Sequence, residues 1–149
     1  MQTTKLEGAE LSGRKWYTSK GNNISMTTIY EPYMDLKRFE KFTVRVAEVI
    51  VKALHEKFGV TLDVKKPNDL MINGKKVAGI LTETEVLGET VSTLLVGVGM
   101  NVNVEEFPSS IEDIATSLKK EYGQEFSREE IIVEICNAID GLYTELMKF

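Results

Sequence analysis

The sequence predicts an α+β fold, a mixed but mostly antiparallel sheet with helices packed on one face. Short segments rich in β-branched and aromatic residues are separated by turn signals, which is typical of strands. An Asn-Gly pair at residues 73–74 joins two of these segments as a hairpin. Apolar residues recur at helical spacing after Asp35 and again after Ser127. Neighbouring antiparallel strands with separate helices favour an α+β sheet.

The first third of the chain predicts a loop, a strand and a helix. Residues 1–15 lack periodicity, so we expect a loop there. Residues 23–30 are β-branched and aromatic, which favours a strand. Asp35 is a candidate N-cap for a helix that Gly59 would end. The apolar residues of this helix recur every three or four positions: Phe39, Phe42, Val46, Val49, Ile50, Ala53 and Leu54.

The middle of the chain predicts a strand, a corner and a hairpin. Alternating apolar residues over 60–64 favour a strand, and Pro67 cannot continue it as a ladder because it lacks a backbone donor. The residues before a proline are pushed toward extended geometry, which leaves Lys65 at a strand end. Asn73-Gly74 suits a type I′ turn, since both central residues of that turn need a positive φ.

The rest of the chain predicts one more strand and two helices. Residues 87–89 form a turn, and 90–102 return as a long apolar strand. Ser109 or Ser110 would cap a helix reaching about Tyr122.

A capping box of Ser127 and Glu130 would open the last helix. Its apolar stripe comprises Ile131, Ile132, Ile135, Ile139, Leu142 and Leu146. Cys136 lies on this stripe without a histidine nearby in sequence, which is typical of a small buried residue. His55 is the one histidine, so a histidine-based triad or metal cluster has too few parts.

The composition limits which domain organisation, partners and compartment we expect for this protein. With 149 residues, we expect one domain spanning 1–149. The 42% hydrophobic and 28% charged content is that of a soluble globular protein, and the net charge of −5 argues against nucleic-acid or anionic-membrane partners. One cysteine and the lack of a long apolar run or leader indicate a cytoplasmic protein.

Five blocks of the sequence resemble the signature of biotin protein ligases, in the family's order. The most specific is residues 65–83, which resembles Lys-Trp-Pro-Asn-Asp, a hairpin, and a Gly-Ile-Leu-x-Glu strand. Residues 12–16 resemble the end of the glycine- and arginine-rich loop, and 21–27 the Gly-x-Asn-Leu-x-x-Ser strand. Residues 96–103 match the Gly-x-Gly-x-Asn strand, and 114–118 the Ala-Thr-Ser-Leu helix start.

The resemblance implies an enzyme that adenylates biotin with ATP and Mg²⁺, then transfers biotin to a lysine of a carboxylase's biotin carboxyl carrier domain. Lys65 matches the lysine that the family places at the biotinyl-adenylate. A fixed lysine can neutralise a carboxylate and an α-phosphate while charge develops between them. The alternative is a solvated lysine at a strand end. In this chain Lys66 replaces the family's tryptophan.

The resemblance also implies four binding residues on neighbouring strands. Lys76 would contact phosphate or carboxylate, and Gly79 and Ile80 would line the biotin pocket through their backbone amides. Asn101 matches the asparagine that faces the nucleotide. Gly79 could instead face a bulky core residue, and Asn101 could be an exposed amide. Asp69 could hold a magnesium-bound phosphate or cap the turn, and the cap is favoured.

Arg14 and Trp16 complete the predicted site, since a tryptophan beside cations suits stacking on a nucleotide. A lone tryptophan in the core is the alternative. The preceding loop departs from the family: of its arginines, Arg14 alone survives. Because each bidentate arginine contact contributes roughly 1.5–3 kcal/mol, we expect weak retention of biotinyl-AMP.

The chain also starts late relative to the family, without its Ser/Thr-x-Asn segment, and lacks the small C-terminal domain. We therefore expect that a homodimer or a separate chain supplies the front segment, that the protein is a degraded relative, or that the sequence is clipped. A catalytically inactive binding module and a lipoate-type ligase remain the alternative functions.

Overall fold

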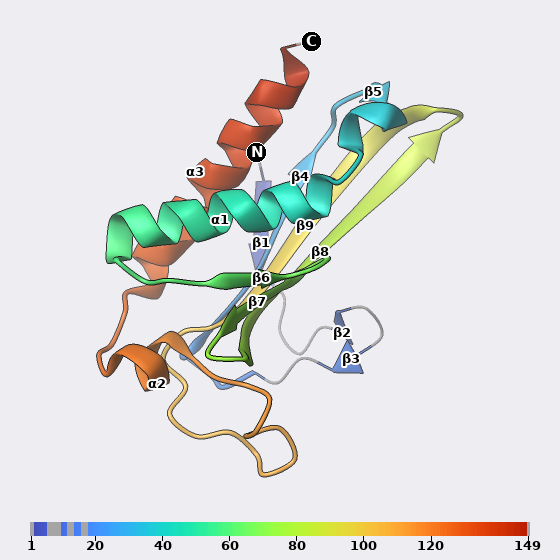
Figure 1. Ribbon diagram of the computed structural model, residues 1–149. Coiled ribbons are helices and arrows are strands. Elements are labelled where there is room, and N and C mark those ends of the chain that lie inside the picture. The colour runs from blue at the N-terminus through green and yellow to red at the C-terminus, as the bar shows by residue number, and fades with distance from the viewer. Residues whose placement is uncertain (1, 6–9, 12–13, 16–17, 149) are drawn as a thin grey trace.

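The computed structural model describes residues 2–5, 10–11, 14–15 and 18–148, with side chains from residue 18 onward. Figure 1 shows one sheet crossed by two long helices. Every pairing between its named strands is antiparallel, in the order β1-β4-β9-β8-β7-β6 with β5 beside β9. The strands are β1 (Gln2–Lys5), β4 (Asn23–Tyr30), β5 (Met34–Asp35), β6 (Asp63–Lys65), β7 (Asp69–Ile72), β8 (Lys75–Leu87) and β9 (Thr90–Asn101). The predicted α+β class is confirmed.

Tight turns join the central strands as the sequence predicts. Asn73 and Gly74 connect β7 to β8 with φ angles of 51° and 77°, the left-handed values that a type I′ turn needs. Gly88, with φ of 66°, lies in the turn between β8 and β9. These turns fix the register of three neighbouring strands and therefore decide which side chains share a face.

Helices α1 (Phe42–Phe58) and α3 (Arg128–Met147) pack on one face of the sheet and against each other (Figure 1). Gly59 ends α1 with φ of 71°, and the Ser127 side chain accepts a hydrogen bond from the Glu130 amide at the start of α3, as predicted. The helices contribute these buried residues to the core: Phe42, Val46, Ala47, Ile50, Leu54, Ile131, Ile135, Ile139 and Leu142.

Apolar side chains of the strands complete this core. Register pairs place Met26 opposite Val98, and Val98 opposite Ile80, all of them buried. A polar contact also ties the sheet to α3, because the Tyr30 phenol donates to Asp140 Oδ1 at 2.6 Å. Burial is the main reason why the pKa of Tyr30 lies far above its usual value, and the contact with Asp140 raises it further.

Several predicted boundaries are wrong. Residues 1–15 were expected as a loop, but β1 pairs with β4, and β2 (Glu10–Leu11) pairs with β3 (Arg14–Lys15). These pairings are backbone ladders, which side-chain periodicity does not reveal. Asp35 caps a 3₁₀ helix, η1 (Leu36–Phe39), rather than α1.

Two other elements are shorter than expected. The strand predicted over residues 60–64 is regular only in β6, although Val60 and Leu62 are buried. The helix expected from Ser109 or Ser110 is instead a five-residue helix, α2 (Leu118–Tyr122), capped by Ser117. Residues 109–114 form hydrogen-bonded turns, and the chain is extended only beside Lys76, whose amide donates to the Ile114 carbonyl and whose carbonyl accepts from the Thr116 amide.

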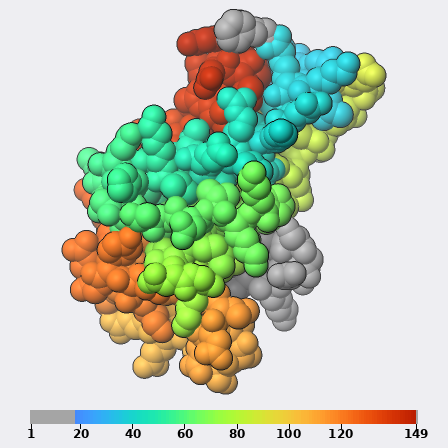
Figure 2. Space-filling view, in the orientation of Figure 1, coloured from blue at the N-terminus to red at the C-terminus, as the bar shows by residue number. Residues whose placement is uncertain are grey.

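The molecule's surface follows this architecture. In Figure 2, α1 and β6 cover the middle of the visible face, and the loop that precedes α2 forms a lobe at one end. Among the residues that the structure describes, no helix combines the length and apolar character that a bilayer crossing requires.

Candidate functional site

A row of residues crosses five strands on the face of the sheet that the long helices leave open. Register pairs join Ser25 to Gly99, Gly99 to Gly79, Gly79 to Asp69, and Asp69 to Lys65. Their neighbours along the strands pack toward the helices, so this cross-strand row lies on the opposite face. Its two central positions, Gly99 and Gly79, have no side chain, so only backbone lies between a hydroxyl at one end and opposite charges at the other.

A second row runs beside the first. Thr27 is opposite Gly97, and Gly97 is opposite Leu81. A Cβ added at Gly97 would lie 3.8 Å from Thr27 Oγ1, which places the threonine hydroxyl on this same open face. Three glycines therefore meet at the centre of a face that carries side chains elsewhere, a pattern typical of strands whose backbone a ligand approaches.

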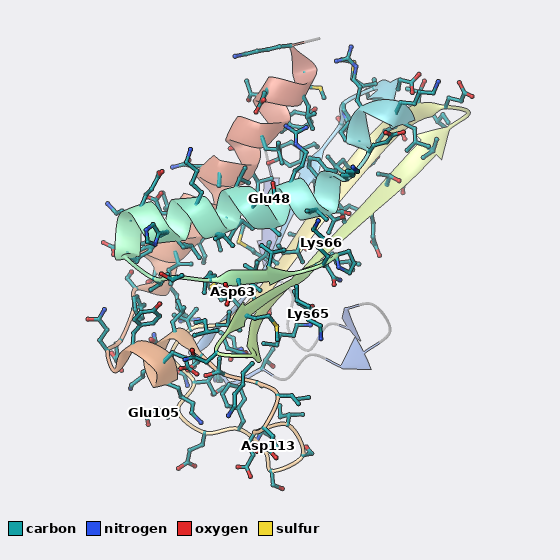
Figure 3. The ribbon with its side chains drawn as sticks, in the orientation of Figure 1. Glu48, Asp63, Lys65, Lys66, Glu105 and Asp113 are labelled. Atoms are coloured by element: carbon teal, nitrogen blue, oxygen red, sulfur yellow. The ribbon has the colours of Figure 1, made fainter. Side chains whose placement is uncertain are left out.

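Lys65 lies at the margin of this face, at the last position of β6. The strand ends there as predicted, and Lys66, Pro67 and Asn68 form the turn into β7. Figure 3 shows Lys65 between β7 and the β2–β3 hairpin, with Lys66 nearer α1. Lys65 is exposed, and no ion pair to it occurs among the described residues, so its ammonium group is available to an anion.

Lys76 lies on the same side but makes an ion pair. Its Nζ is 2.9 Å from Asp69 Oδ1, with both side chains about a quarter exposed, at 30% and 23%. Asp69 therefore holds a cation rather than only capping the turn. Because Lys76 also bonds through its backbone to the segment before α2, the pair fixes this lysine in position.

The predicted backbone contacts of Gly79 and Ile80 differ in the structure. Gly79 is buried at the centre of the cross-strand row. Ile80 points the other way into the core, and its amide donates to the Asn68 carbonyl at 2.9 Å. The Ile80 N–H is therefore already bonded within the fold, which corrects the expectation that it donates to a ligand, whereas the ligand contact expected of Gly79 stays a prediction.

Asn101 is buried, not exposed, with 3% of its surface accessible. Its Oδ1 accepts from Asn23 Nδ2 at 2.6 Å, and its Nδ2 donates to the Thr116 carbonyl at 3.1 Å. The expectation that this amide needs buried partners is confirmed. Asn101 thus joins β4 and β9 to the segment that contacts Lys76, and can orient the edge of the site.

Arg14 lies in β3, opposite Leu11 of β2. Its side chain and all of Trp16 lie outside the described residues, so their predicted contacts stay predictions. The hairpin itself is informative, because β2 contacts β8 on the side of the sheet away from α1 and α3 (Figure 1).

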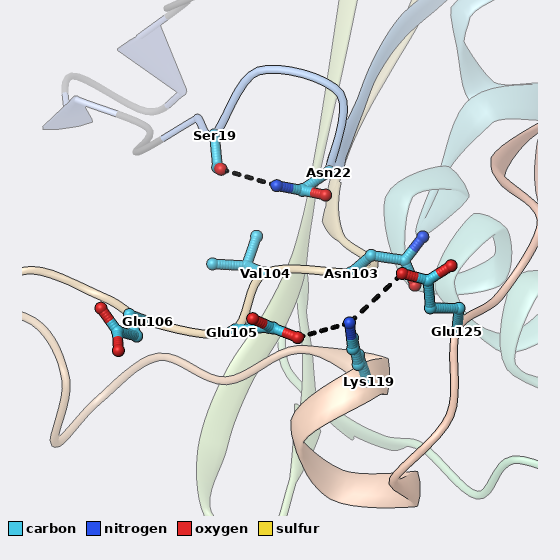
Figure 4. Close-up of a pocket in the computed structure, with 8 residues that line it drawn as sticks. All are labelled: Ser19, Asn22, Asn103, Val104, Glu105, Glu106, Lys119 and Glu125. Atoms are coloured by element: carbon cyan, nitrogen blue, oxygen red, sulfur yellow. Dashed lines mark hydrogen bonds and ion pairs between the residues drawn. The ribbon is translucent and has the colours of Figure 1, made fainter.

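A polar pocket of about 460 Å³ lies at the end of β9, lined by Ser19, Asn22, Asn103, Val104, Glu105, Glu106, Lys119 and Glu125. Lys119 pairs with both Glu105 and Glu125 (Figure 4). The hydrogen bond from Lys119 lowers the pKa of Glu105, and the same bond, followed by that to Glu125, raises the pKa of Lys119. A protein cation thus already pairs with two of the three glutamates that line this pocket.

Sequence reasoning did not single out Ser25, Thr27 or Asn23 as site residues. All three occur in the 21–27 block, but which face each one occupies depends on its register against β9. The sequence signal that could have found them is the alternation of side chains between the two faces of β4. It assigns residues to the open face only once the face that packs on the core is known.

The open face can therefore hold an elongated anionic molecule. It offers glycine backbone at its centre, a cation at one margin and hydroxyls toward the other. Within the described part of the chain, no group of three or more histidine, cysteine or acidic residues is placed to hold a metal ion.

Comparisons with known proteins agree on one family. The family model described as "Biotin/lipoate A/B protein ligase family" matches residues 3–101. The Bifunctional ligase/repressor BirA of Bacillus subtilis is 35% identical over 136 residues, covering 90% of this chain and 42% of that protein. The Biotin--[acetyl-CoA-carboxylase] ligase of Paracoccus denitrificans is 31% identical over 133 residues, covering 86% of this chain and 55% of that protein.

A solved structure shares the architecture. The biotin protein ligase from Aquifex aeolicus in complex with biotin and ATP superimposes with a TM-score of 0.72 at 30% identity, covering 93% of this chain and 55% of that one. The chain spans about half the length of the relatives that it matches.

Proposed function

The chain belongs to the biotin/lipoate A/B protein ligase family, and from this premise we propose that it carries the catalytic face of a biotin protein ligase. The observation that carries the proposal is the cross-strand row, in which a lysine that makes no ion pair with the described residues lies at the margin of a glycine centre. Such a face suits a small carboxylic acid whose acid group must be held at a cation.

The reaction has two steps. A biotin carboxylate oxygen attacks the α-phosphorus of ATP, which forms biotinyl-AMP and releases pyrophosphate. The neutral amine of an acceptor lysine then attacks the acyl carbon, AMP leaves, and the amine loses its proton to solvent. The acceptor is a biotin carboxyl carrier domain, and an ATP-dependent reaction of this kind belongs in the cytoplasm.

Lys65 would contribute most of the electrostatic stabilisation of the first step. Two anions meet in the first step, and a cation already in place lowers the cost of bringing them together. Lys65 is held at the end of a paired strand, so less reorganisation is needed as charge develops. Since its side chain is exposed, it can reach a phosphate beyond the sheet margin.

The other residues would position the substrates. Lys76, held by Asp69, would contact phosphate, and the Gly79 backbone would lie against biotin. Asn101 would act by fixing the segment at Thr116 that borders the nucleotide. Arg14 of β3, and Trp16 two residues later in the sequence, would cover the adenylate.

Mg²⁺ would bind together with ATP. The Asp69 carboxylate is paired with Lys76 and does not fit the role of a metal ligand. Magnesium is commonly bound through substrate phosphates while keeping several waters, so it would arrive as the counter-ion of ATP.

A catalytically inactive binding module is the second candidate function. The observation that favours it is the segment from Gly8 to Arg14, which keeps one arginine where the family loop carries several. Such a module would bind biotin, but would form and retain little adenylate.

One experiment separates these functions. The 149-residue chain is mixed with biotin, ATP and Mg²⁺, and pyrophosphate release is followed, then labelling of a biotin carboxyl carrier domain. Release with biotin but not with lipoate supports the ligase. Calorimetric binding of biotin without release supports the module. Release with lipoate alone, or binding of neither acid, contradicts the proposal.

A further inference from the structure

We propose that the hydroxyl of Thr27 hydrogen-bonds to the polar head of the acid substrate and selects for a head that carries N–H and C=O groups. This inference rests on the proposed function and adds a specificity-determining residue to the same face. It starts from a buried hydroxyl oxygen, Thr27 Oγ1, for which the described residues supply no hydrogen-bond partner.

Thr27 is 8% exposed, and its Oγ1 is buried without a hydrogen-bond partner in the described part of the chain. Leaving such a group unsatisfied costs about 1–3 kcal/mol, and nearly all buried polar groups in folded proteins are paired. A valine of almost the same shape would avoid this cost. The hydroxyl is therefore explained if a ligand supplies the missing partner.

The surroundings of Thr27 are suited to a ligand. Across the ladder lies Gly97, which has no side chain to fill the space beside the hydroxyl, and Gly99 follows two residues on. A methyl group at Gly97 would make only ordinary contacts, the nearest at 3.6 Å. Glycine is thus not required there by crowding within the described protein, which leaves approach by another molecule as a reason for it.

The neighbouring threonine provides an internal contrast. Thr28 faces the helices, and among the described residues its Oγ1 is also buried without a hydrogen-bond partner. It lies close enough to Tyr30 to lower the pKa of that phenol against the larger effect of burial. Thr27 faces the side of the sheet away from the helices, beside Gly97, where a bound molecule rather than the core could supply the partner. Two adjacent threonines thus point to opposite faces of the sheet.

The span of the sheet fits a molecule that reaches from Thr27 to Lys65. Their strands, β4 and β6, are four spacings apart, roughly 19 Å at about 4.8 Å each. An extended lysine side chain spans roughly 6 Å of that distance. The remainder suits a compact ring with a short acid tail, whose carboxylate lies at Lys65 and whose head lies at Thr27.

The chemistry of the hydroxyl then discriminates between heads. It can donate to a carbonyl oxygen or accept from an N–H, both of which a cyclic urea offers. A dithiolane ring, as in lipoate, offers neither and would leave Thr27 unsatisfied. Sites that must hydrogen-bond a substrate reject analogues that lack the group, because their own buried polar atoms stay unpaired.

The test uses calorimetric titration of the full 149-residue chain with biotin and with lipoate. The variants are Thr27→Val, which removes the hydroxyl, Thr27→Ser, which keeps it, and Thr28→Val as a control on the other face. We expect about tenfold weaker biotin binding for Thr27→Val, with Thr27→Ser and Thr28→Val within about twofold of the parent. Thermal unfolding without ligand should show Thr27→Val at least as stable as the parent.

Other results overturn the inference. Equal biotin affinity in Thr27→Val and the parent removes the role of the hydroxyl but leaves the proposed function intact. An equal loss in Thr27→Val and Thr28→Val assigns the effect to the fold. If the parent chain binds lipoate and not biotin, or neither, both the inference and the proposed function fail.

Discussion

The helix-packed face of the sheet is filled with apolar side chains, whereas the opposite face of the same strands carries glycines, hydroxyls and charges. On β9, Val98 packs toward the helices, and its neighbours Gly97 and Gly99 face the open side. The first face buries surface and stabilises the fold. The second carries glycines in place of apolar side chains at its centre, a pattern typical of strands whose backbone a ligand approaches. One strand can therefore serve folding and function by alternation alone.

The largest effect should come from cutting a buried side chain on the helix side. Ile50→Ala removes three carbons from a fully buried site of α1 and should lower the free energy of unfolding by about 2–5 kcal/mol. Urea denaturation at neutral pH measures this. Its counterpart, Gly97→Ala, should change stability by less than about 1 kcal/mol and weaken biotin binding. If Gly97→Ala proves the more destabilising, the division between the faces is wrong.

The next largest effect should come from the cation of the open face. Lys65→Met should reduce biotin-dependent pyrophosphate release about 10²–10³-fold, because a preorganised charge in the transition state contributes on this scale. The exposed position predicts an unchanged melting temperature. Lys66→Met, one residue further along the turn, is the matched control and should keep most activity. Comparable losses in both variants would argue against a specific role for Lys65.

A smaller effect should follow at the edge where the two faces meet. Asn101→Ala leaves Asn23 Nδ2 and the Thr116 carbonyl without their partner and should cost about 1–3 kcal/mol of stability. A double-mutant cycle with Asn23→Ala should show coupling, since the two amides bond directly. Strictly additive effects in urea denaturation would mean that this contact is not maintained in solution.

The smallest effect should come from the polar contact on the helix side. Tyr30→Phe should cost about 1 kcal/mol, because it removes the hydrogen bond to Asp140. Burial raises the pKa of Tyr30 above its usual 10.0, so the folded state holds this proton more tightly. This contribution is complete below about pH 10 and is lost as the pH rises through the folded-state pKa.

Urea denaturation between pH 9 and 11 tests this, as rough bounds around the ordinary tyrosine pKa. The parent chain should lose stability above about pH 10, and Tyr30→Phe should lose less. Some slope should remain in the variant, because burial also raises the pKa of Tyr143. Parallel pH profiles for the two proteins would show that the Tyr30 phenol does not titrate with unfolding.

Local signals predicted those parts of the fold that depend on a few neighbouring residues. Asn73-Gly74, Gly59 and Ser127 each determine a turn or a helix end through their own backbone or side-chain geometry, and each is found where expected. The helix expected from Ser109 or Ser110 does not run on to Tyr122, because a distant residue, Lys76, forms hydrogen bonds with the backbone of Ile114 and Thr116. Propensity cannot register such competition.

The sequence by itself determined the family blocks, the lysine at the strand end and the alternation of each strand, because these are properties of contiguous residues. Only the tertiary structure decided that Lys65, Asp69, Gly79, Gly99 and Ser25 form one row, since a shift of one residue in any register would move that strand's members to the other face. The partnerless hydroxyl of Thr27 became visible for the same reason: whether a polar atom is satisfied depends on what the fold brings near it.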